Sequence, residues 1–356
     1  MKFLYKNLLK PFLFLFDPER VHNWFVSIGE FCGRFRLTRW LLTLFYSHKP
    51  KKISKTVDGI TYHSPIMLAA GFDYNGRLTQ VLDTLSFGAV EIGSVTAKPT
   101  PGNPKPRLRR MIKSKAFIVY KGLKNEGVEQ IMRRLKSTRP APGFVIGVSV
   151  AKTNDAETVS TEAGIADYCQ SFQRLNEEEI GDFYTINISC PNVHGGESFT
   201  SPSLLTPLMS ALDKIPCSKP VYVKMPINLP WDEFNSLLQI LDKSRVHGVV
   251  IGNLNKNYAD ADFPEEAPEE YRGGLSGKVC RELSTQLIRE TKTTWGNRFT
   301  IIGCGGILSV EDALEKLDAG ADLLQLISGM IYEGPHLMKD ICLALERRMN
   351  SEKSGL

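Results

Sequence analysis

Short apolar runs recur along the chain from residue 66 onward, and each is bounded by glycine, proline or polar residues. Short runs without alternation are typical of parallel strands that are covered on both faces. They lie at residues 66–70, 89–95, 144–150, 183–188, 221–225, 248–251, 299–302 and 322–326. Helical spacing of apolar residues separates most of them, at residues 165–175, 231–241, 283–291 and 310–319. This alternation predicts an α/β fold, a (β/α)8 TIM barrel, with its active site at the carboxyl ends of the strands.

The segments outside this repeat divide the chain. We expect an N-terminal amphipathic helical segment at residues 1–46, the barrel at residues 47–350 and a tail at residues 351–356. The Asp58-Gly59 pair predicts a tight hairpin that covers one end of the barrel. Residues 97–140 form a long basic insertion, which we expect to lie over the active-site mouth.

The helical segment is rich in phenylalanine and tryptophan, more than a small helical pair can bury. Lys2, Lys6 and Lys10 share one face of its first helix. The apolar run at residues 11–16 is too short to cross a bilayer. Two interpretations stay open: the helices pack on the barrel, or they lie on a membrane surface with the lysines at the lipid headgroups.

Composition excludes several classes of function. Hydrophobic residues make up 42% of the chain and charged residues 23%, which is ordinary for a folded protein. The net charge of +5 is small and unclustered, so nucleic-acid binding is not expected. The seven cysteines lie far apart without CxxC spacing, which favours reduced thiols in a cytoplasmic protein and no metal site.

Reactive residues follow several predicted strands. Lys224 ends an apolar strand, where a buried ammonium group requires a partner, so it forms a Schiff base or faces negative charge on a cofactor ring. Cys190 lies between two asparagines in a loop that breaks at Gly195-Gly196, which favours an acid/base or nucleophilic role. Gly305-Gly306 and Ser328-Gly329 follow the last two strands, as in the phosphate sites of such barrels. A phosphorylated cofactor is therefore expected.

Several longer motifs stand in order along nearly the whole chain. They include Phe16-Asp17-Pro18-Glu19-Arg20-Val21-His22, Leu68-Ala69-Ala70-Gly71-Phe72-Asp73, Val90-Glu91-Ile92-Gly93-Ser94-Val95-Thr96, Gly273-Gly274-Leu275-Ser276-Gly277 and Ile302-Gly303-Cys304-Gly305-Gly306-Ile307. Together they resemble the dihydroorotate dehydrogenase family, specifically its quinone-using, membrane-associated class. The resemblance implies FMN as cofactor, oxidation of dihydroorotate to orotate in de novo pyrimidine biosynthesis, and a quinone as electron acceptor. It also implies peripheral attachment to the inner face of the cell membrane through the N-terminal helices.

The resemblance also implies roles for individual residues. Cys190 would take the C5 proton of dihydroorotate while a hydride passes from C6 to the flavin, and Lys224 would face the N1/C2 edge of the ring. The implied cofactor contacts are Ala69, Ala70, Gly71, Ser94, Ser149, Asn187, Lys224, Gly252, Ser276, Gly277, Gly305, Gly306, Ile327 and Ser328. The implied substrate contacts are Tyr74, Gly122, Leu123, Asn187, Asn192, Asn253 and Leu254. His22 and Arg110 would line the quinone site.

Several positions depart from the family pattern. Cys190 replaces the serine that is usual in the quinone-using class, and Tyr74 stands where the family has lysine. Val119-Tyr120-Lys121-Gly122-Leu123-Lys124 stands for Asn-Arg-x-Gly-Phe-Asn. Because each buried polar contact left unmade costs about 1–3 kcal/mol, two alternatives remain. They are an FMN oxidoreductase of the same fold that acts on a different cyclic substrate, and a catalytically inactive homologue. Oligomeric state is not predicted.

Overall fold

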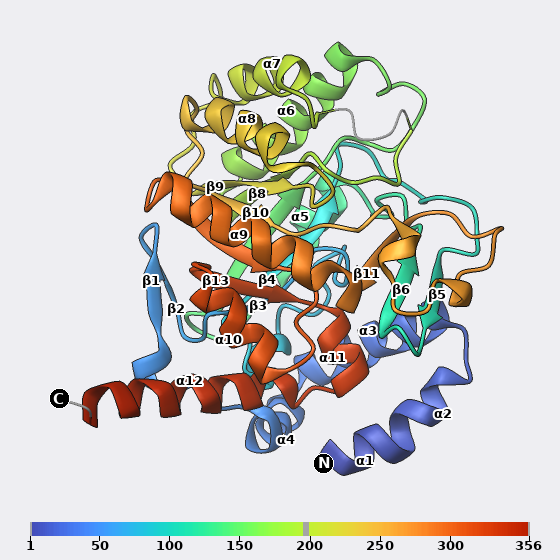
Figure 1. Cartoon of the computed structure of the whole chain (residues 1–356), viewed down its shortest axis with the longest axis vertical. Helices are drawn as coiled ribbons and strands as arrows, with labels where there is room; N and C mark the ends of the chain where they lie inside the picture. Colours follow the sequence, from blue (N-terminus) through green and yellow to red (C-terminus); the bar gives the residue numbers. More distant parts are fainter. Residues whose placement is uncertain (1, 195–198, 355–356) are drawn as a thin grey trace.

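The computed structural model describes residues 2–194 and 199–354, so the glycine pair Gly195-Gly196 lies outside the described residues. Its centre is a closed barrel of eight parallel strands (Figure 1). The strands are β3 (Ile66–Leu68), β4 (Ala89–Val95), β7 (Val145–Val150), β8 (Phe183–Asn187), β9 (Val221–Met225), β10 (Gly248–Ile251), β12 (Thr300–Cys304) and β13 (Leu323–Leu326). The predicted barrel is confirmed, and strand ends differ from the prediction by at most two residues.

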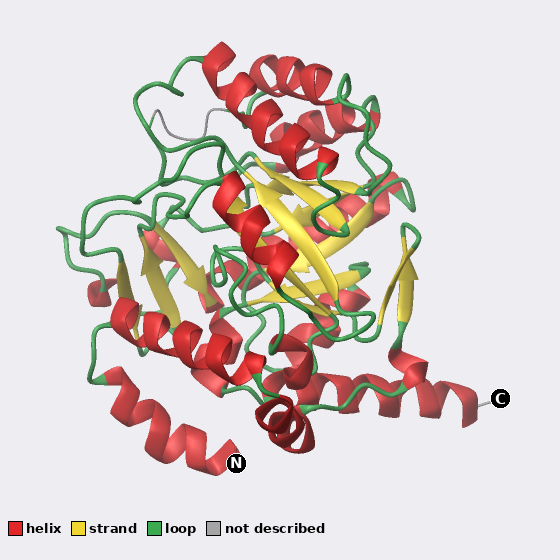
Figure 2. Ribbon diagram, turned by 180° about the vertical axis from the view of Figure 1, so that it is seen from behind, coloured by secondary structure: helices red, strands yellow, loops and turns green. Residues whose placement is uncertain are grey.

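Helices cover the outside of the barrel (Figure 2). They are α5 (Val128–Ser137), α6 (Thr161–Glu177), α7 (Pro202–Leu212), α8 (Trp231–Asp242), α9 (Arg281–Trp295), α10 (Val310–Asp318), α11 (Ser328–Glu333) and α12 (Leu337–Ser354). The predicted insertion at residues 97–140 was too long, because α5 buries Val128, Ile131 and Met132 as the crossover helix between β4 and β7. The tail boundary at residue 350 also falls inside α12.

The part of the insertion that precedes α5 forms an antiparallel sheet together with one strand from the loop after β10. This sheet lines the cavity at the mouth of the barrel, and we call it the mouth sheet. Its central strand β6 (Ala116–Val119) pairs with β5 (Leu108–Met111) and with β11 (Gly274–Gly277), which comes from the loop after β10. The hydroxyl of Tyr332 in α11 donates to the carbonyl oxygens of Ala116 and Met111, at 2.7 and 3.1 Å. The last barrel helices are thereby joined to the mouth sheet.

The opposite end of the barrel is closed by a hairpin (Figure 1). It consists of β1 (Lys55–Val57) and β2 (Ile60–Tyr62), as the Asp58-Gly59 pair predicted. Val57 and Tyr62 pack on the apolar residues near the start of the barrel strands, and the hydroxyl of Tyr222 donates to Asp58 at 2.7 Å. Solvent is therefore excluded from the barrel floor.

The N-terminal helices are α1 (Lys2–Leu4), η1 (Tyr5–Leu9), α2 (Lys10–Phe14), α3 (Pro18–Arg34) and α4 (Arg36–Tyr46). The first three are continuous. Lys2 forms an ion pair with Asp340 at 2.7 Å, Lys6 pairs with Glu333, and Lys10 donates to the carbonyl oxygen of Tyr332 at 3.1 Å. The interpretation that these lysines lie at lipid headgroups is therefore wrong, since they hold the helix on the barrel.

The same helices expose most of the large apolar side chains that reach solvent. Of the 21 exposed large hydrophobic residues described, 17 lie between Phe3 and Phe45. We call the most exposed of these the apolar face: Phe3, Leu8, Phe12, Leu15, Ile28, Phe31, Leu37, Trp40 and Leu44. Among the described helices, none is both long and apolar enough to cross a bilayer. A concentration of exposed apolar side chains on adjoining helices indicates an interaction surface.

The hydroxyl of Tyr332 predicts a measurable effect on stability. Tyr332→Phe leaves the buried carbonyl oxygens of Ala116 and Met111 without this donor, which should lower the free energy of unfolding by about 1–3 kcal/mol. Tyr271→Phe, next to the mouth sheet, is the matched control, because its ring stacks on Arg109 and its hydroxyl has no described partner. It should change stability by less than about 0.5 kcal/mol. Equal denaturation midpoints for both variants would contradict the assignment.

Candidate functional site

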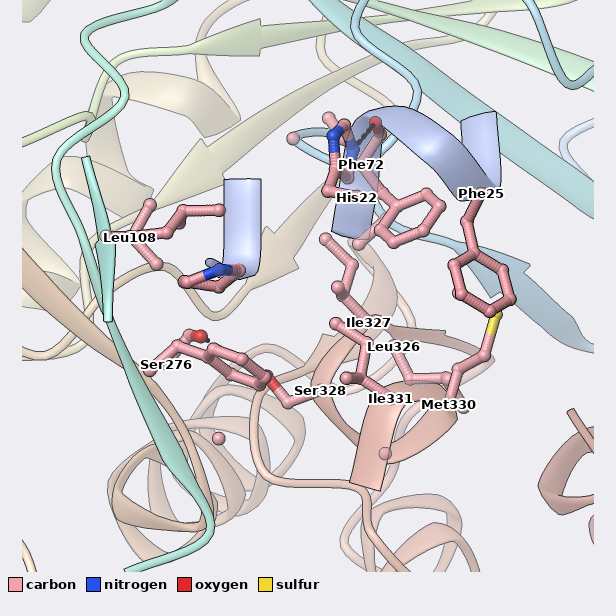
Figure 3. Close-up of a pocket in the computed structure, with 18 of the residues that line it drawn as sticks. His22, Phe25, Phe72, Leu108, Ser276, Leu326, Ile327, Ser328, Met330 and Ile331 are labelled. Carbon is pink, nitrogen blue, oxygen red and sulfur yellow. Dashed lines mark hydrogen bonds between the residues drawn. The ribbon is translucent and has the colours of Figure 1, made fainter. Parts of the chain in front are cut away.

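A cavity of about 830 Å³ lies between the strand ends, the mouth sheet and the N-terminal helices. Its size is that of a pocket for a small molecule or cofactor. Figure 3 shows Ser276 and Ser328 close together in one part of it, and His22, Phe72 and Phe25 around another. One space therefore joins a polar region at the strand ends to an apolar region under the helices.

The predicted site residues converge on this cavity. The lining includes Ala69, Ala70, Gly71, Tyr74, Ser94, Gly122, Leu123, Asn187, Cys190, Asn192, Lys224, Gly252, Asn253, Leu254, Ser276, Gly277, Gly305, Gly306, Ile327, Ser328, His22 and Arg110. Ser149 is the exception. Its side chain is fully buried behind the cavity wall, where its hydroxyl lies 2.8 Å from that of Ser94. Contact of Ser149 with the cofactor stays a prediction, and in this structure Ser149 reaches the cavity through Ser94.

A hydrogen-bond chain fixes the polar side chains at the strand ends. Asn187 Nδ2 donates to Ser94 Oγ at 2.8 Å. Asn253 Nδ2 donates to Ser189 Oγ at 2.7 Å and lies 3.3 Å from Asn187 Oδ1. Ser189 in turn donates to the carbonyl oxygen of Lys224 at 2.8 Å. The amides on β8 and after β10 are thus oriented before any ligand binds.

Lys224 brings a buried positive charge to the cavity. It lies beside Asn187 in the sheet, and among the described residues no hydrogen bond or ion pair reaches its ammonium group. One layer deeper, Glu91 accepts hydrogen bonds from Thr185 and Gln325, both at 2.8 Å. Lys224 therefore has no ionic partner among the described residues, which favours the binding of an anionic ligand over a structural ion pair.

Four thiols line the cavity, those of Cys32 in α3 and of Cys190, Cys280 and Cys304 nearer the strand ends, and their surroundings differ. Burial raises the pKa of Cys280 to about 12. Burial also raises the pKa of Cys304, an effect that the charge of Lys224 partly offsets. Both thiols therefore stay protonated at neutral pH. Cys190 is only half-buried, on the loop after β8. It is the thiol best suited to exchange a proton with a ligand.

The loop of Cys190 is held against the mouth sheet. Asn192 Nδ2 donates to the carbonyl oxygen of Val119 at 2.8 Å, and Asn103 Nδ2 donates to the carbonyl oxygen of Asn192 at 2.9 Å. The hydroxyl of Tyr168 donates to the carbonyl oxygen of Asn187 at 2.7 Å. The insertion therefore contributes directly to the position of the reactive loop.

The part of the cavity around Ser276 and Ser328 suits a phosphate. The two hydroxyl oxygens lie 3.2 Å apart (Figure 3). Gly277, Gly305 and Gly306 line the same cavity. Gly305 and Gly306 have positive φ angles of 100° and 72°, and a Cβ on Gly306 would meet the Arg281 backbone at 2.6 Å. Only glycine fits this turn, which supports the sequence-based expectation of a phosphate site.

His22 and Arg110 lie in the apolar part of the cavity. His22 Nε2 is 2.8 Å from the carbonyl oxygen of Phe72, so it carries the proton and leaves Nδ1 to accept from the Tyr74 hydroxyl, 3.3 Å away. Burial lowers the pKa of His22 to about 4, so the ring is neutral. Arg110 donates to the carbonyl oxygen of Phe16 at 2.7 Å, whereas its buried Nε has no partner among the described residues.

Sequence reasoning missed one charged group beside the cavity. Glu19 of α3 lies against Lys121, Arg107 and Lys124. Glu19 stands within a sequence motif, and Lys121 and Lys124 differ from the family pattern, but none of the three was predicted to be a site residue. Their spacing along the chain carries no signal of contact, because it depends on how α3 packs on the insertion.

Comparisons with known proteins agree with this geometry. The sequence model of the dihydroorotate dehydrogenase family matches residues 52–349. The dihydroorotate dehydrogenase (quinone) of Christiangramia forsetii is 36% identical over 95% of this chain and 97% of that protein. A protein of the same name from a Synechococcus strain is 34% identical over 97% of this chain and 94% of its own length.

Solved structures share the fold. The crystal structure of DHODH from Eimeria tenella in complex with ferulenol has a TM-score of 0.79 at 24% identity, covering 95% of this chain and 93% of that chain. The ligand-free DHODH structure from the same organism has a TM-score of 0.75 at 25% identity, covering 91% and 95%. With the family model matching most of its length, the chain belongs to the dihydroorotate dehydrogenase family.

Proposed function

We propose that this protein is an FMN-dependent dihydroorotate dehydrogenase that oxidises dihydroorotate to orotate and passes the electrons to a quinone. The observation that carries the proposal is one cavity that joins Lys224, Cys190 and Asn187 to the apolar region around His22 and Arg110. Two electron-transfer partners of different polarity require such a divided space. The relatives named for this activity match nearly the full chain.

The residues at the strand ends fit FMN. The glycine turn beside Ser276 and Ser328 suits its phosphate, and Lys224 offers a buried cation to the electron-rich edge of its ring. FMN held by these residues would supply a hydride acceptor for C6 of dihydroorotate and an electron donor for the quinone. Lys224 would stabilise negative charge at the ring edge, and no Schiff base is needed.

Cys190 would act as the general base that removes the C5 proton of dihydroorotate. A thiol has an ordinary pKa of about 8.5, so modest lowering makes it effective near neutrality. Asn187, Asn192 and Asn253 would hold the substrate ring, because their side chains line the cavity around Cys190. Hydrogen bonds to Ser94, Ser189 and the Val119 carbonyl orient these amides in advance.

A second candidate is an FMN oxidoreductase of the same fold for a different cyclic substrate. Two observations favour it. The Tyr74 hydroxyl is directed to His22 rather than to the strand ends, and Val119 offers the cavity no polar side chain. If dihydroorotate does not reduce the FMN-loaded protein, this second candidate is favoured.

The quinone would enter between the N-terminal helices. The buried Nε of Arg110 is a donor without a described partner, which suits a quinone carbonyl oxygen. We assign residues 1–46 to membrane contact and quinone access and residues 47–350 to the FMN-binding barrel. Attachment through the apolar face would be peripheral, at the inner face of the cell membrane.

The role of Cys190 is tested by anaerobic mixing with dihydroorotate while flavin absorbance is followed. Cys190→Ala should slow flavin reduction by roughly 10²–10⁴-fold, because general-base catalysis is lost. Cys190→Ser should retain part of the rate. Cys217→Ala is the matched control, since Cys217 lies outside the cavity lining and its thiol donates a hydrogen bond to the carbonyl oxygen of Lys219. A wild-type rate in Cys190→Ala would exclude Cys190 as the base.

The role of Arg110 is tested by steady-state kinetics with a short-chain quinone. Arg110→Leu removes a charged donor, which should raise KM for quinone by roughly 10-fold and leave anaerobic flavin reduction by dihydroorotate unchanged. Arg109→Leu is the control on the same strand, because Arg109 stacks on Tyr271 and lies outside the cavity lining. Equal effects of both variants on KM would contradict a specific quinone contact.

The membrane role of the apolar face is tested by co-sedimentation with phospholipid vesicles. Trp40→Glu should weaken binding by roughly 10–100-fold, because burial of a large apolar side chain contributes about 1.5–3 kcal/mol. Thr43→Glu adds the same charge at an exposed polar position of α4 and should have a smaller effect. Identical binding of these two variants and the wild type would reject attachment through this face.

A further inference from the structure

Three cations converge on one buried carboxylate at the edge of the cavity. Glu19 Oε1 lies 3.1 Å from Lys121 Nζ, 3.4 Å from Arg107 Nη1 and 3.9 Å from Lys124 Nζ. The side chains of Glu19, Arg107 and Lys121 are only 7, 12 and 13% exposed, and that of Lys124 is 36% exposed. We call these four residues the Glu19 cluster.

The Glu19 cluster lacks negative charge. It combines three positive charges with one carboxylate, and no other described carboxylate lies within ion-pair distance of the three cations. Buried charges that stay uncompensated are costly. Burial also lowers the pKa of Lys121, an effect that Glu19 partly offsets. The cluster is therefore suited to receive an anion from a ligand.

The Glu19 cluster faces the region where the substrate ring would bind. Lys121 and Lys124 line the same cavity as Cys190 and Asn192. The segment that carries them is tied to the Cys190 loop, because Asn192 donates to the carbonyl oxygen of Val119 at 2.8 Å. A ring held near Cys190 therefore shares its cavity with this cluster as well as with Lys224.

The aromatic neighbour of Lys121 in the cavity is Tyr74, which is uncharged. Lys121 Nζ lies 5.4 Å from the centre of the Tyr74 ring, a cation–π contact. The Tyr74 hydroxyl is directed to His22, and burial raises its pKa to about 12, so Tyr74 supplies no charge.

We propose that Lys121, assisted by Lys124, binds the anionic group of the ring substrate and shares its charge between that group and Glu19. Lys121 is then a specificity-determining residue for that group. This inference rests on the proposed function for the location of the ring. Charge-assisted hydrogen bonds from an ammonium group to a carboxylate are among the strongest polar contacts in proteins.

The test uses the FMN-loaded full chain, titrated with orotate and with uracil, which has the same ring without the carboxylate. Flavin absorbance reports binding. Lys121→Met should weaken orotate binding by roughly 10–100-fold and leave uracil binding unchanged, because only the charged contact is lost. Lys121→Arg should restore most of the affinity. Lys113→Met removes the same charge at an exposed position of the insertion and should affect neither ligand.

Equal orotate affinity in the wild type and Lys121→Met, or equal losses for orotate and uracil, would overturn the inference. If Lys121→Met does not retain FMN, Lys121→Gln takes its place. If the wild type does not bind orotate, nicotinate and benzoate are titrated instead. Lys121-dependent binding of these carboxylates would support the inference and reject dihydroorotate as substrate, whereas no binding of any of them would overturn the inference.

Discussion

Closure of the barrel is the constraint on which the site depends. Eight parallel strands bring their carboxyl ends to one rim, so residues far apart in the chain become neighbours. Asn187 and Lys224 lie side by side on β8 and β9, and Asn187 forms hydrogen bonds with Ser94 on β4 and Asn253 after β10, each of these strands lying one strand away from β8. Because the rim is rigid, small differences at single positions change what it binds without changing the fold.

The other wall of the cavity comes from elements added to the barrel. Tyr332 fastens the mouth sheet to α11, and Glu19 fastens α3 to the segment after β6. Two layers thereby cover the carboxyl end of the barrel, the polar mouth sheet and the apolar N-terminal helices. Polar groups from the mouth sheet meet the Cys190 loop, and apolar residues of the helices meet the region around Arg110. Oxidation of a polar ring and reduction of a lipophilic acceptor can then share one cofactor.

Much of this was predictable from the sequence, for physical reasons. Apolar runs revealed the strands, and the barrel topology then located Lys224, Cys190 and Gly305-Gly306 at one rim. Ser149 lies behind the cavity lining, because proximity to a strand end does not reveal whether a side chain faces the cavity or a neighbouring strand. The Glu19 cluster was missed because it depends on packing between α3 and the insertion. The expected orientation of Lys2, Lys6 and Lys10 was also wrong, because helical spacing shows that residues share a face but not what that face contacts.

The inward lysines of the first helix have a consequence for how the molecule would meet a lipid. Most amphipathic helices that rest on membranes present cations to anionic headgroups. Here Lys2, Lys6 and Lys10 are paired with Asp340, Glu333 and the Tyr332 carbonyl, and most of the large side chains that the first helix exposes are phenylalanine and leucine. Adsorption through those side chains would follow the area of hydrocarbon buried. It would depend less on ionic strength than adsorption through a row of unpaired lysines would.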